Sequence, residues 1–322
     1  MRPALYFIVN QGAGTGRTAR LWKKIKPMLE EQKIPYEAFF TEYEHHATVL
    51  ARQLTAADDS ALKEAVYLVV VGGDGTVNEV LNGIRDFDRV RLGVIPSGSG
   101  NDFARNLWIP KNPRKSLPMI LECMDREIRD GIPAPAMDLG TVSWPGCEKP
   151  CIFCISAGVG LDAIVCKKAL HSRIKKVLNA LHLGKLTYLI LTVASLSTMD
   201  TAEVTMTGDD HTDKSFHKMI FAAVMNLRTE GGGVPMAPAA VPTDGFLSVG
   251  SASGIPKWKT FFCLPFLVAA KQERIRGFEM TNAKNLVLES DKPMVLHADG
   301  EYCGDVRKAE FHCLKGRLRL LR

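Results

Sequence analysis

An aspartate flanked by glycines follows a strongly apolar run near residue 70. Val66–Val71 is rich in β-branched residues and bounded by glycine, which predicts a strand buried on both faces. Apolar positions recur at helical spacing from Val77, so Gly72–Thr76 connects a strand to a helix. Backbone N–H groups at a helix start favour anions such as phosphate. A carboxylate repels a bare phosphate, so Asp74 is best explained if it holds a cation that the phosphate shares.

Two further glycine-rich loops follow predicted strands. One is Asn10–Gly16, and the other is Pro96–Phe103, where Asn101 or Asp102 is expected to cap a short helix. The first lacks both the ending of a P-loop and the spacing of a dinucleotide fingerprint. A turn that needs glycine, with an aspartate as helix cap, explains each loop taken singly. Three such loops at the carboxyl edge of one sheet, two of them with an acid, favour phosphate binding.

Strands that alternate with helices predict a doubly wound parallel α/β sheet for the first part of the chain. The expected strands are 5–10, 36–41, 66–71 and 91–95, and the expected helices are 18–32, 47–57, 77–84, 103–107 and 113–123. This first domain is expected to span residues 1–138.

After Asp138 strands dominate, which predicts an antiparallel β-sandwich as a second domain over residues 139–306. The expected strands are 139–143, 151–156, 202–206, 218–225, 245–251, 285–288 and 294–298, with helical insertions at 159–197 and 256–276. The closing segment 307–322, with a strand at 317–321, can be assigned to either domain. The expected fold class is therefore α/β followed by β.

The amino-acid composition restricts the kind of molecule that the chain is expected to bind. The chain has 322 residues, a formal net charge of +6 and 46% hydrophobic residues. A mildly basic chain suits an anionic ligand or membrane surface, and the lack of an arginine-rich run argues against nucleic acid. The apolar runs are shorter than a spanning helix needs, and no signal peptide is recognised at the start. We therefore expect a cytoplasmic protein with reduced cysteines.

Several motifs together resemble the diacylglycerol kinase catalytic-domain family. They are Gly72–Val80, Pro96–Arg105, Asp138–Gly140 and Asp299–Glu301, and they span almost the whole chain in the family's order. The resemblance is to the soluble bacterial lipid kinases in particular, and the same domain occurs in sphingosine and ceramide kinases. It implies a first domain like that of NAD kinases and phosphofructokinases, followed by a lipid-kinase sandwich.

The resemblance also implies an activity, namely ATP- and Mg²⁺-dependent transfer of the γ-phosphoryl group to a lipid hydroxyl. Diacylglycerol, which would give phosphatidic acid, is the leading acceptor; phosphatidylglycerol, a polyprenol and a sphingoid base stay open. The lipid would be met by peripheral contact with the inner membrane face. An NAD kinase-like enzyme and a non-catalytic nucleotide- or lipid-binding regulator are the alternatives, and a homodimer is left open.

The family's site positions carry over to individual residues. The positions that hold ATP are matched by Asn10, Gln11, Gly12, Ala13, Gly14, Thr41, Gly72, Gly73, Asp74, Gly75, Thr76, Val77, Ser99 and Asn101. Gln11 stands where the family usually has proline. The acids of a magnesium–water network are matched by Asp74, Asp102 and Asp138, and Asp74 is also counted as catalytic.

The remaining implied roles fall on both halves of the chain. Glu301 matches the proposed general base, and Arg17 and Arg20 match basic positions near the lipid head group. Asp244 matches the ligand of a second, structural magnesium ion, to which Val241 and Phe246 would contribute backbone carbonyls.

Two segments combine basic and apolar residues. A basic cluster at 167–176 precedes the apolar stretch 186–196, and the apolar run 261–270 lies between Lys259 and Lys271. The simpler interpretations are a solvated charged face and a core helix kinked at Pro265. In a lipid kinase, either segment could instead dock on an anionic bilayer.

Overall fold

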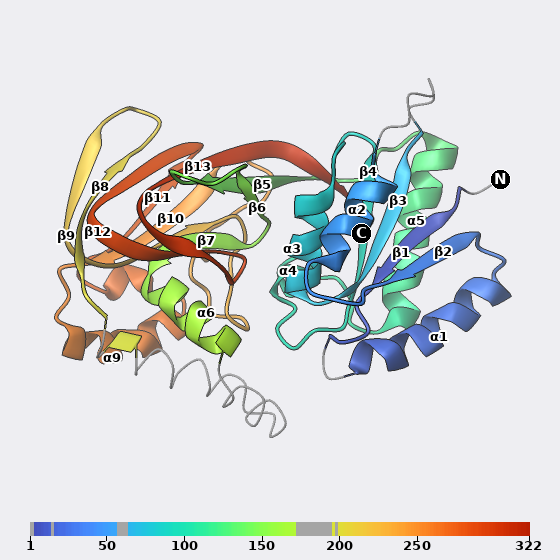
Figure 1. Cartoon of the computed structure of the whole chain (residues 1–322), viewed down its shortest axis with the longest axis horizontal. Coiled ribbons are helices and arrows are strands. Elements are labelled where there is room, and N and C mark those ends of the chain that lie inside the picture. Colours follow the sequence, from blue (N-terminus) through green and yellow to red (C-terminus); the bar gives the residue numbers. More distant parts are fainter. Residues whose placement is uncertain (1–2, 14–15, 57–63, 172–194, 197–198) are drawn as a thin grey trace. The chain divides into compact units, whose positions relative to one another are not determined.

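The chain folds into two compact units, as the computed structural model in Figure 1 shows. It describes residues 3–13, 16–56, 64–171, 195–196 and 199–322. Unit 1 comprises Met1–Met137 together with Gly316–Arg322, and unit 2 comprises Asp138–Lys315. Each unit has a hydrophobic core of its own.

Unit 1 is built on a parallel sheet with the strand order β2-β1-β3-β4-β13. The strands are β1 (Leu5–Val9), β2 (Tyr36–Phe40), β3 (Val66–Gly72), β4 (Val90–Pro96) and the last residues of β13 (Glu301–Leu320). Leu5 pairs with Tyr36 on one side and with Tyr67 on the other. The order changes direction at β1, so the loops after β1 and β3 leave from neighbouring strands at one edge.

Helices cover both faces of this sheet, as the sequence predicted. They are α1 (Arg17–Glu31), α2 (His46–Leu54), α3 (Asp74–Gly83), α4 (Asp102–Asn106) and α5 (Pro113–Asp130). Side chains of α1 and α5 share one core cluster with Phe7, Val69 and other residues of one sheet face. Helices α2 and α3 pack together in Figure 1, and α2 contacts β1. The doubly wound α/β fold is confirmed.

Helix α5 is longer than predicted. It was expected to end near Cys123 but continues to Asp130. Its buried residues Leu117, Leu121 and Met124 extend the helical spacing beyond the expected end. Gly131 ends the helix in the left-handed region, with φ 67°, and its N–H donates to the carbonyl of Arg126.

Unit 2 is an antiparallel β-sandwich, again as predicted. Its strands are β5 (Ala136–Ser143), β6 (Cys151–Phe153), β7 (Ser156–Gly160), β8 (Ala202–Thr207), β9 (Asp213–Met225), β10 (Leu247–Ser253), β11 (Phe278–Ala283), β12 (Asn285–Ala298) and β13. The first halves of β9 and β12 pair with β8, and their second halves pair with β7. These two long strands thus belong to both layers of the sandwich, the one that contains β7 and the one that contains β8. The layers enclose a core that includes Phe153, Leu296 and Phe311.

Several strand boundaries in unit 2 were predicted wrongly. The expected strand 151–156 is divided into β6 and β7, because the N–H groups of Cys154 and Ile155 donate to the carboxylate of Asp299 instead of to a strand. The expected turn at 290–293 is a register irregularity within a continuous β12, and β11 was not foreseen. The expected strand 317–321 is the end of β13, which pairs with β4 in unit 1.

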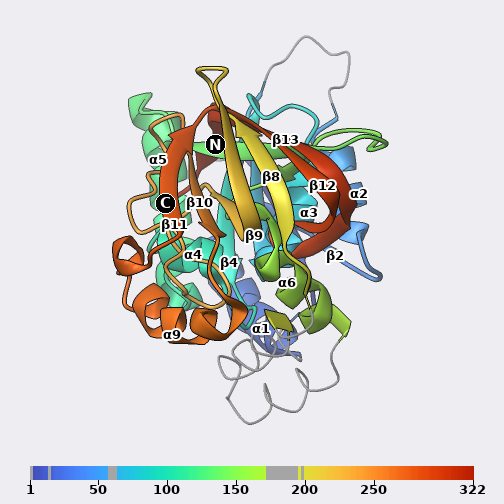
Figure 2. The same ribbon diagram turned by 90° about the vertical axis from the view of Figure 1, so that its left-hand side faces the viewer.

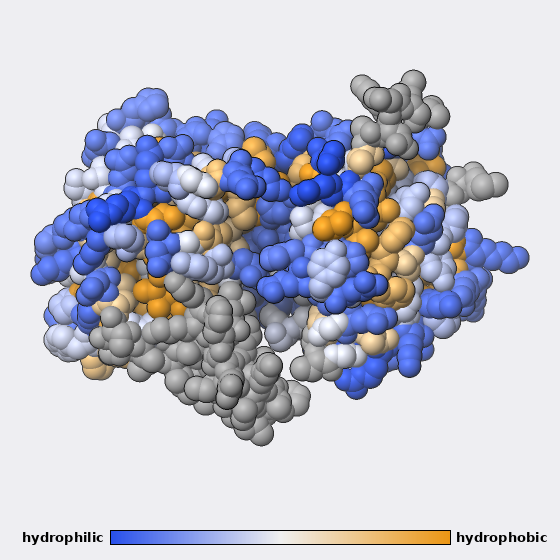
Figure 3. Space-filling view, viewed as in Figure 1, coloured by the Kyte–Doolittle hydropathy of each residue, from blue (hydrophilic) through white to orange (hydrophobic). Residues whose placement is uncertain are grey.

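The helical parts of unit 2 lie along one side of its sheet in Figure 2. They are α6 (Leu161–His171), α9 (Lys257–Val268) and the short η1 (Gln272–Arg274), and residues of α6 and α9 pack on one core cluster. Most of the predicted insertion 159–197, including most of the basic cluster 167–176 and of the apolar stretch 186–196, lies outside the described residues. Hydrophilic side chains cover much of the face shown in Figure 3. Within the described part of the chain, no helix is long and apolar enough to cross a membrane.

The carboxylate of Asp209 in unit 2 joins two neighbouring turns. Its titration is expected to make the stability of unit 2 depend on pH. Asp209, between β8 and β9, accepts hydrogen bonds from the N–H groups of Lys284 (2.7 Å) and Asn285 (2.9 Å). Partial burial raises the pKa of Asp209, but these hydrogen bonds outweigh it and hold the pKa below its ordinary value.

Asp209→Asn is therefore expected to lower the free energy of unfolding by about 1 kcal/mol at pH 7. The folded-state pKa is depressed, so the advantage of the wild type is complete above the unfolded-state pKa and disappears as the pH falls through the folded-state pKa. Urea unfolding at pH 7 and pH 3 measures the difference, with Asp200→Asn, an exposed position of the same unit, as control. A difference that does not shrink at pH 3 would contradict the assignment.

Candidate functional site

Two glycine loops of unit 1 touch each other through their backbones. A Cβ built on Gly73, after β3, would lie 3.1 Å from the Cα of Gly98, and one built on Gly98, after β4, would lie 2.7 Å from the Cα of Gly73. Contacts below 3.0 Å with backbone atoms are not tolerated without a shift. The predicted convergence of these two loops is therefore present; it requires glycine at Gly98 and leaves little room for a side chain at Gly73.

This contact gives a first prediction for the site. Gly98→Ala is expected to lower the free energy of unfolding of unit 1 by about 1–3 kcal/mol, because the new methyl group must push the two backbones apart. Urea unfolding and calorimetric titration with ATP measure the stability and the nucleotide affinity. Gly208→Ala is the control, since its nearest neighbour would lie 3.7 Å away. Equal stability of the two variants would mean that the loops can separate at no cost.

Asp74 binds the start of the neighbouring helix rather than capping its own. Its two carboxylate oxygens accept hydrogen bonds from the N–H groups of Asp102 (3.0 Å) and Phe103 (3.1 Å), at the first turn of α4. The predicted cap by Asn101 or Asp102 is therefore wrong: Asn101 occupies the cap position in a left-handed conformation without a capping side-chain bond. The side chain that caps α4 comes from the first residue of α3.

The start of α3 has no side-chain cap of its own. Gly73 is its N-cap residue, and no side chain bonds to the helix start from that position. The first N–H groups of an α-helix have no partner within the helix itself. This arrangement suits an anion that approaches the glycine loop.

The first loop is tied to the other two by side chains. The Asn10 side chain donates to the Thr76 hydroxyl (3.1 Å) and accepts from the N–H of Ala13 (3.2 Å). The hydroxyls of Thr18 and Ser97 are 2.6 Å apart and buried. Sequence reasoning missed Thr18 and Ser97, although both are hydroxyl residues next to the glycines. All three loops thus meet at one edge of the sheet.

Other residues expected near the nucleotide lie around this edge. Thr41 is at the carboxyl end of β2, and its N–H donates to the carbonyl of Val9. Ser99 is exposed. The Val77 side chain is buried in the core, so it faces away from any ligand. Gly14 lies outside the described residues.

Charged side chains stand beside the loops. The Arg17 guanidinium lies 3.5 Å from the carbonyl of Gly98, whereas the Arg20 side chain is exposed farther along α1. Asp102 is buried and forms an ion pair with Arg105, a pairing that its i,i+3 spacing could have indicated. Two acids, Asp74 and Asp102, therefore lie together in unit 1.

Asp138 belongs to unit 2, where it organises the loop that carries Asp244. Its carboxylate accepts from the N–H of Gly245 (2.6 Å), and its own N–H donates to the carbonyl of Pro242. Burial, assisted by the charges of Asp138 and Asp244, raises the pKa of Cys313 to about 12. The charges of Lys284 and Lys315 act on Cys313 in the opposite direction, so carboxylates and basic side chains both lie close to this loop.

The three residues expected at the structural magnesium site lie in this loop. The N–H of Asp244 lies 3.4 Å from the carbonyl of Val241, and the carboxylate of Asp244 accepts from the N–H of Phe246 (2.9 Å). The ammonium group of Lys284 lies 5.1 Å from the centre of the Phe246 ring. The loop is compact around Asp244, although a basic side chain stands next to it.

Glu301 follows a two-residue hairpin turn between β12 and β13. Ala298 pairs with Glu301, and both turn residues have positive φ, Asp299 at 49° and Gly300 at 88°. This is the hairpin geometry that an Asp-Gly pair favours. The Asp299 carboxylate accepts from the N–H groups of Cys154, Ile155 and Ser156 at 2.7–3.0 Å. The turn is therefore held in place from a separate strand.

A buried histidine fixes the other side of this turn. His297 accepts the N–H of Gly300 at Nδ1 (3.2 Å), so its Nε2 carries the proton shared with Asp162 (3.1 Å) at the start of α6. Sequence reasoning did not single out Asp162 or His297. A histidine within an otherwise apolar strand was the available signal, but its partner is 135 residues away.

Comparison with known proteins identifies the family. The diacylglycerol kinase catalytic domain matches residues 4–130, and the YegS C-terminal NAD kinase beta sandwich-like domain matches residues 155–322. The Bacillus subtilis protein named "Putative lipid kinase YtlR" is 31% identical over 300 residues, which cover 93% of each chain. The chain belongs to the diacylglycerol kinase catalytic-domain family of lipid kinases.

Further relatives in this family agree with the assignment. A Bacillus subtilis "Diacylglycerol kinase" is 30% identical over 266 residues, which cover 80% of this chain and 79% of the relative. A crystal structure described as "a putative diacylglycerol kinase from Bacillus anthracis str. Sterne" has a TM-score of 0.72 at 21% identity and covers 99% of this chain and 97% of its own. That structure supports the fold, and the names of the relatives favour a lipid kinase over an NAD kinase.

Membership in this family implies ATP as a substrate, and the loops of unit 1 fit it. The Oδ1 atom of Asn101 is buried, and it has no hydrogen-bond partner among the described residues. An unpaired buried acceptor is costly unless a ligand or water binds it. The unpaired oxygen of Asn101 therefore favours a polar ligand or a water molecule at this edge of the sheet.

The fit to Mg²⁺ is less complete within each unit. In the described parts of the chain, no group of three or more His, Cys, Asp and Glu side chains lies close enough to hold a metal ion. Unit 1 offers Asp74 and Asp102, whereas Asp138 and Asp244 are in unit 2. Oxygen ligands of this kind suit Mg²⁺, which also keeps water molecules and substrate phosphates as ligands.

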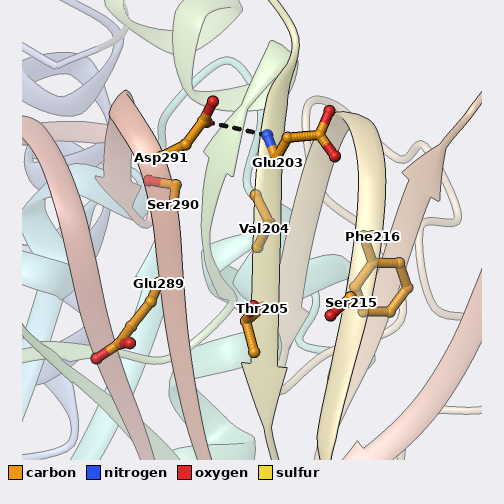
Figure 4. A pocket seen from close by; sticks show the side chains of 8 residues that line it. All are labelled: Glu203, Val204, Thr205, Ser215, Phe216, Glu289, Ser290 and Asp291. Carbon is orange, nitrogen blue, oxygen red and sulfur yellow. Dashed lines mark hydrogen bonds between the residues drawn. The ribbon is translucent and has the colours of Figure 1, made fainter.

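A surface pocket in unit 2 is not part of this site. Its volume is about 390 Å³, and Figure 4 shows the residues that line it along β8, β9 and β12. None of the expected site residues is among them. Three of the lining residues, Glu203, Glu289 and Asp291, are acidic, which disfavours a phosphate ligand.

Proposed function

We propose that this chain is an ATP- and Mg²⁺-dependent kinase that transfers the γ-phosphoryl group of ATP to the hydroxyl of diacylglycerol, giving phosphatidic acid. The observation that carries the proposal is the convergence of the loops after β3 and β4 at Asp74, in a chain that belongs to a lipid kinase family. Phosphoryl transfer depends mainly on positioning and charge neutralisation, which loops of this kind can provide.

The loops of unit 1 would hold the nucleotide. The N–H groups at the start of α3 would bind phosphate oxygens, and Gly73 and Gly98 would allow the backbone to approach them closely. The Asn101 amide, with its unpaired oxygen, would accept a hydrogen bond from the ligand or from a bound water molecule. The residues of Asn10–Ala13, Thr41 and Ser99 would line the same edge.

Asp74 and Asp102 would hold Mg²⁺ in unit 1, and Asp138 is the third acid that we assign to the magnesium–water network. When bound, Mg²⁺ would neutralise charge on the transferring phosphate groups. Because Asp74 already accepts two backbone N–H groups, its carboxylate is fixed in orientation before any ligand binds. Asp244, with the carbonyls of Val241 and Phe246, would hold the structural ion of unit 2.

Glu301 would act as the general base. Its carboxylate would take the proton of the lipid hydroxyl as the hydroxyl oxygen attacks the γ-phosphorus. The anchored turn formed by Asp299 and Gly300 would keep this carboxylate in one position. The positive charge of Arg17, close to Gly98, would stabilise the negative charge of the phosphate groups or the lipid head group, and Arg20 would contribute at a greater distance.

A direct assay tests the proposal. The chain is incubated with γ-labelled ATP and Mg²⁺ and with mixed micelles that contain diacylglycerol, phosphatidylglycerol, a polyprenol or a sphingoid base, or with soluble NAD. Label is expected in phosphatidic acid, and its formation should stop when EDTA removes the metal ion. Label in another lipid would correct the acceptor alone. Label in NAD, or ATP binding without transfer to any acceptor, would overturn the lipid kinase proposal.

The proposed lipid acceptor implies a cellular location for the protein. Diacylglycerol is embedded in a bilayer, so we propose that the protein acts in the cytoplasm by peripheral contact with the inner membrane face. Its net charge of +6 favours an anionic surface.

A further inference from the structure

Helix α9 presents an apolar surface to solvent. Between Trp258 and Val268, four large apolar side chains are exposed: Trp258 (62%), Phe262 (68%), Phe266 (39%) and Val268 (67%). The first three are four residues apart and therefore follow one face of the helix. The opposite side of α9, with Phe261 and Leu267, packs on the core cluster of unit 2. Helix α9 thus carries apolar residues both on its inner side and on its outer side.

Basic side chains surround this outer face. Residues 257–276 contain five basic residues and one acidic residue, a net charge of +4. Lys259, Lys271, Arg274 and Arg276 are exposed. The ammonium group of Lys259 lies 5.3 Å from the centre of the Trp258 ring, so a positive charge stands directly beside the exposed aromatic residue. Tryptophan with adjacent basic residues is typical of segments that lie at a membrane–water interface.

We propose that the outer face of α9, formed by Trp258, Phe262, Phe266 and Val268, docks on an anionic lipid bilayer. This proposal rests on the proposed function, since a kinase for diacylglycerol must reach a lipid in a bilayer. The apolar side chains enter the region between head groups and acyl chains, and the basic residues contact lipid phosphates. The concentration of positive charge also disfavours a second copy of this chain as the occupant, because two such faces repel each other.

The location of α9 within unit 2 agrees with this role. Helices α6 and α9 contribute to the same core cluster, on one side of the sheet (Figure 2). Helix α6 carries Asp162, whose hydrogen bond with His297 supports the turn before Glu301. The docking helix and the support of the proposed general base therefore belong to the same side of the same unit.

Vesicle binding without ATP tests the docking surface. Wild-type protein is expected to cosediment with vesicles of equal phosphatidylglycerol and phosphatidylcholine, and less with pure phosphatidylcholine or in 0.5 M salt. Trp258→Ala with Phe262→Ala should lower the partition coefficient about tenfold or more. Trp108→Ala, at the most exposed tryptophan of unit 1 (85%), is the matched control and should bind like the wild type. Equal binding by the α9 double variant would overturn the proposal.

A second measurement does not depend on the stability of the double variant. Vesicles with brominated acyl chains should quench part of the tryptophan fluorescence of the wild type. Trp258→Phe is expected to remove this quenching, and Trp108→Phe is expected to leave it. Quenching that survives in Trp258→Phe would show that α9 does not enter the bilayer. Conversion of a dimer into a monomer by the α9 variants without vesicles would make this face a contact between copies, and would also overturn the proposal.

These outcomes are separable from failure of the proposed function. Vesicle binding through α9 without phosphorylation of any lipid would retain the docking surface and reject the lipid kinase. Phosphorylation of a dispersed short-chain diacylglycerol, combined with bilayer binding that is independent of α9, would retain the kinase and reject the docking surface.

Discussion

Replacing Glu301 by glutamine is expected to lower the rate of phosphoryl transfer by about 10²–10⁴-fold. Glutamine preserves the shape of the side chain but cannot take a proton from the lipid hydroxyl. The turn that positions residue 301 is anchored by Asp299 and His297, so the substitution should move neither the turn nor the side chain that follows it. The KM for ATP and the urea unfolding midpoint should therefore stay close to those of the wild type, while kcat falls.

Glu310→Gln provides the matched control, since Glu310 lies on the same strand β13 and forms an exposed ion pair with Lys308. It should retain the activity of the wild type in the same micelle assay. If Glu301→Gln keeps kcat within about threefold, another group takes the proton, and the role assigned to Glu301 is wrong.

Replacing Asp74 is expected to affect both stability and catalysis, and two variants separate the effects. Asp74→Ala removes both acceptors of the α4 N–H groups and should lower the free energy of unfolding by about 1–2 kcal/mol. Asp74→Asn keeps one acceptor oxygen and should cost about half as much. Both should lower kcat/KM by about 10²–10³-fold, since each loses the carboxylate charge that would hold Mg²⁺.

Urea unfolding gives the stabilities, and initial rates over a range of Mg²⁺ concentrations give the metal dependence. Asp86→Asn is the control, because Asp86 is a carboxylate of the same unit that also accepts a backbone N–H, from Asp88. Should Asp74→Asn retain activity within about tenfold at every Mg²⁺ concentration, Asp74 would serve only to cap α4.

Local sequence patterns were sufficient for the framework of the site. The apolar run Val66–Val71 correctly predicted β3, and the change to helical spacing at Val77 correctly predicted α3. Both patterns could be recognised because each is set within a few residues. Glycine loops after parallel strands converge by topology, which is why the sequence predicted that the loops after β3 and β4 lie at one edge, although it did not predict the contact of Gly73 with Gly98. The hairpin before Glu301 agrees with the turn chemistry of an Asp-Gly pair, which is also set within a few residues.

The side-chain partners within the site could not be predicted in this way. The bond from Asp74 to the start of α4 joins residues 28 and 29 positions apart, and no local pattern distinguishes it from a cap of α3. The division of the expected strand at Cys154 depends on Asp299, 145 residues later. Long-range hydrogen bonds of this kind decide which carboxylate meets which N–H group, and they follow from the assembled fold.

The parallel sheet of unit 1 has consequences for the order in which the chain can fold. Strand β4 pairs on one side with β3 and on the other with Arg319 and Leu320 of β13, and Leu318, Leu320 and Leu321 are buried. During synthesis these residues leave the ribosome only after all of unit 2. Until then β4 exposes an unpaired apolar edge, the kind of surface that invites aggregation. Unit 1 can therefore be completed only after unit 2 has been synthesised, so a chain truncated just before Gly316 should lose the stability of unit 1 rather than that of unit 2.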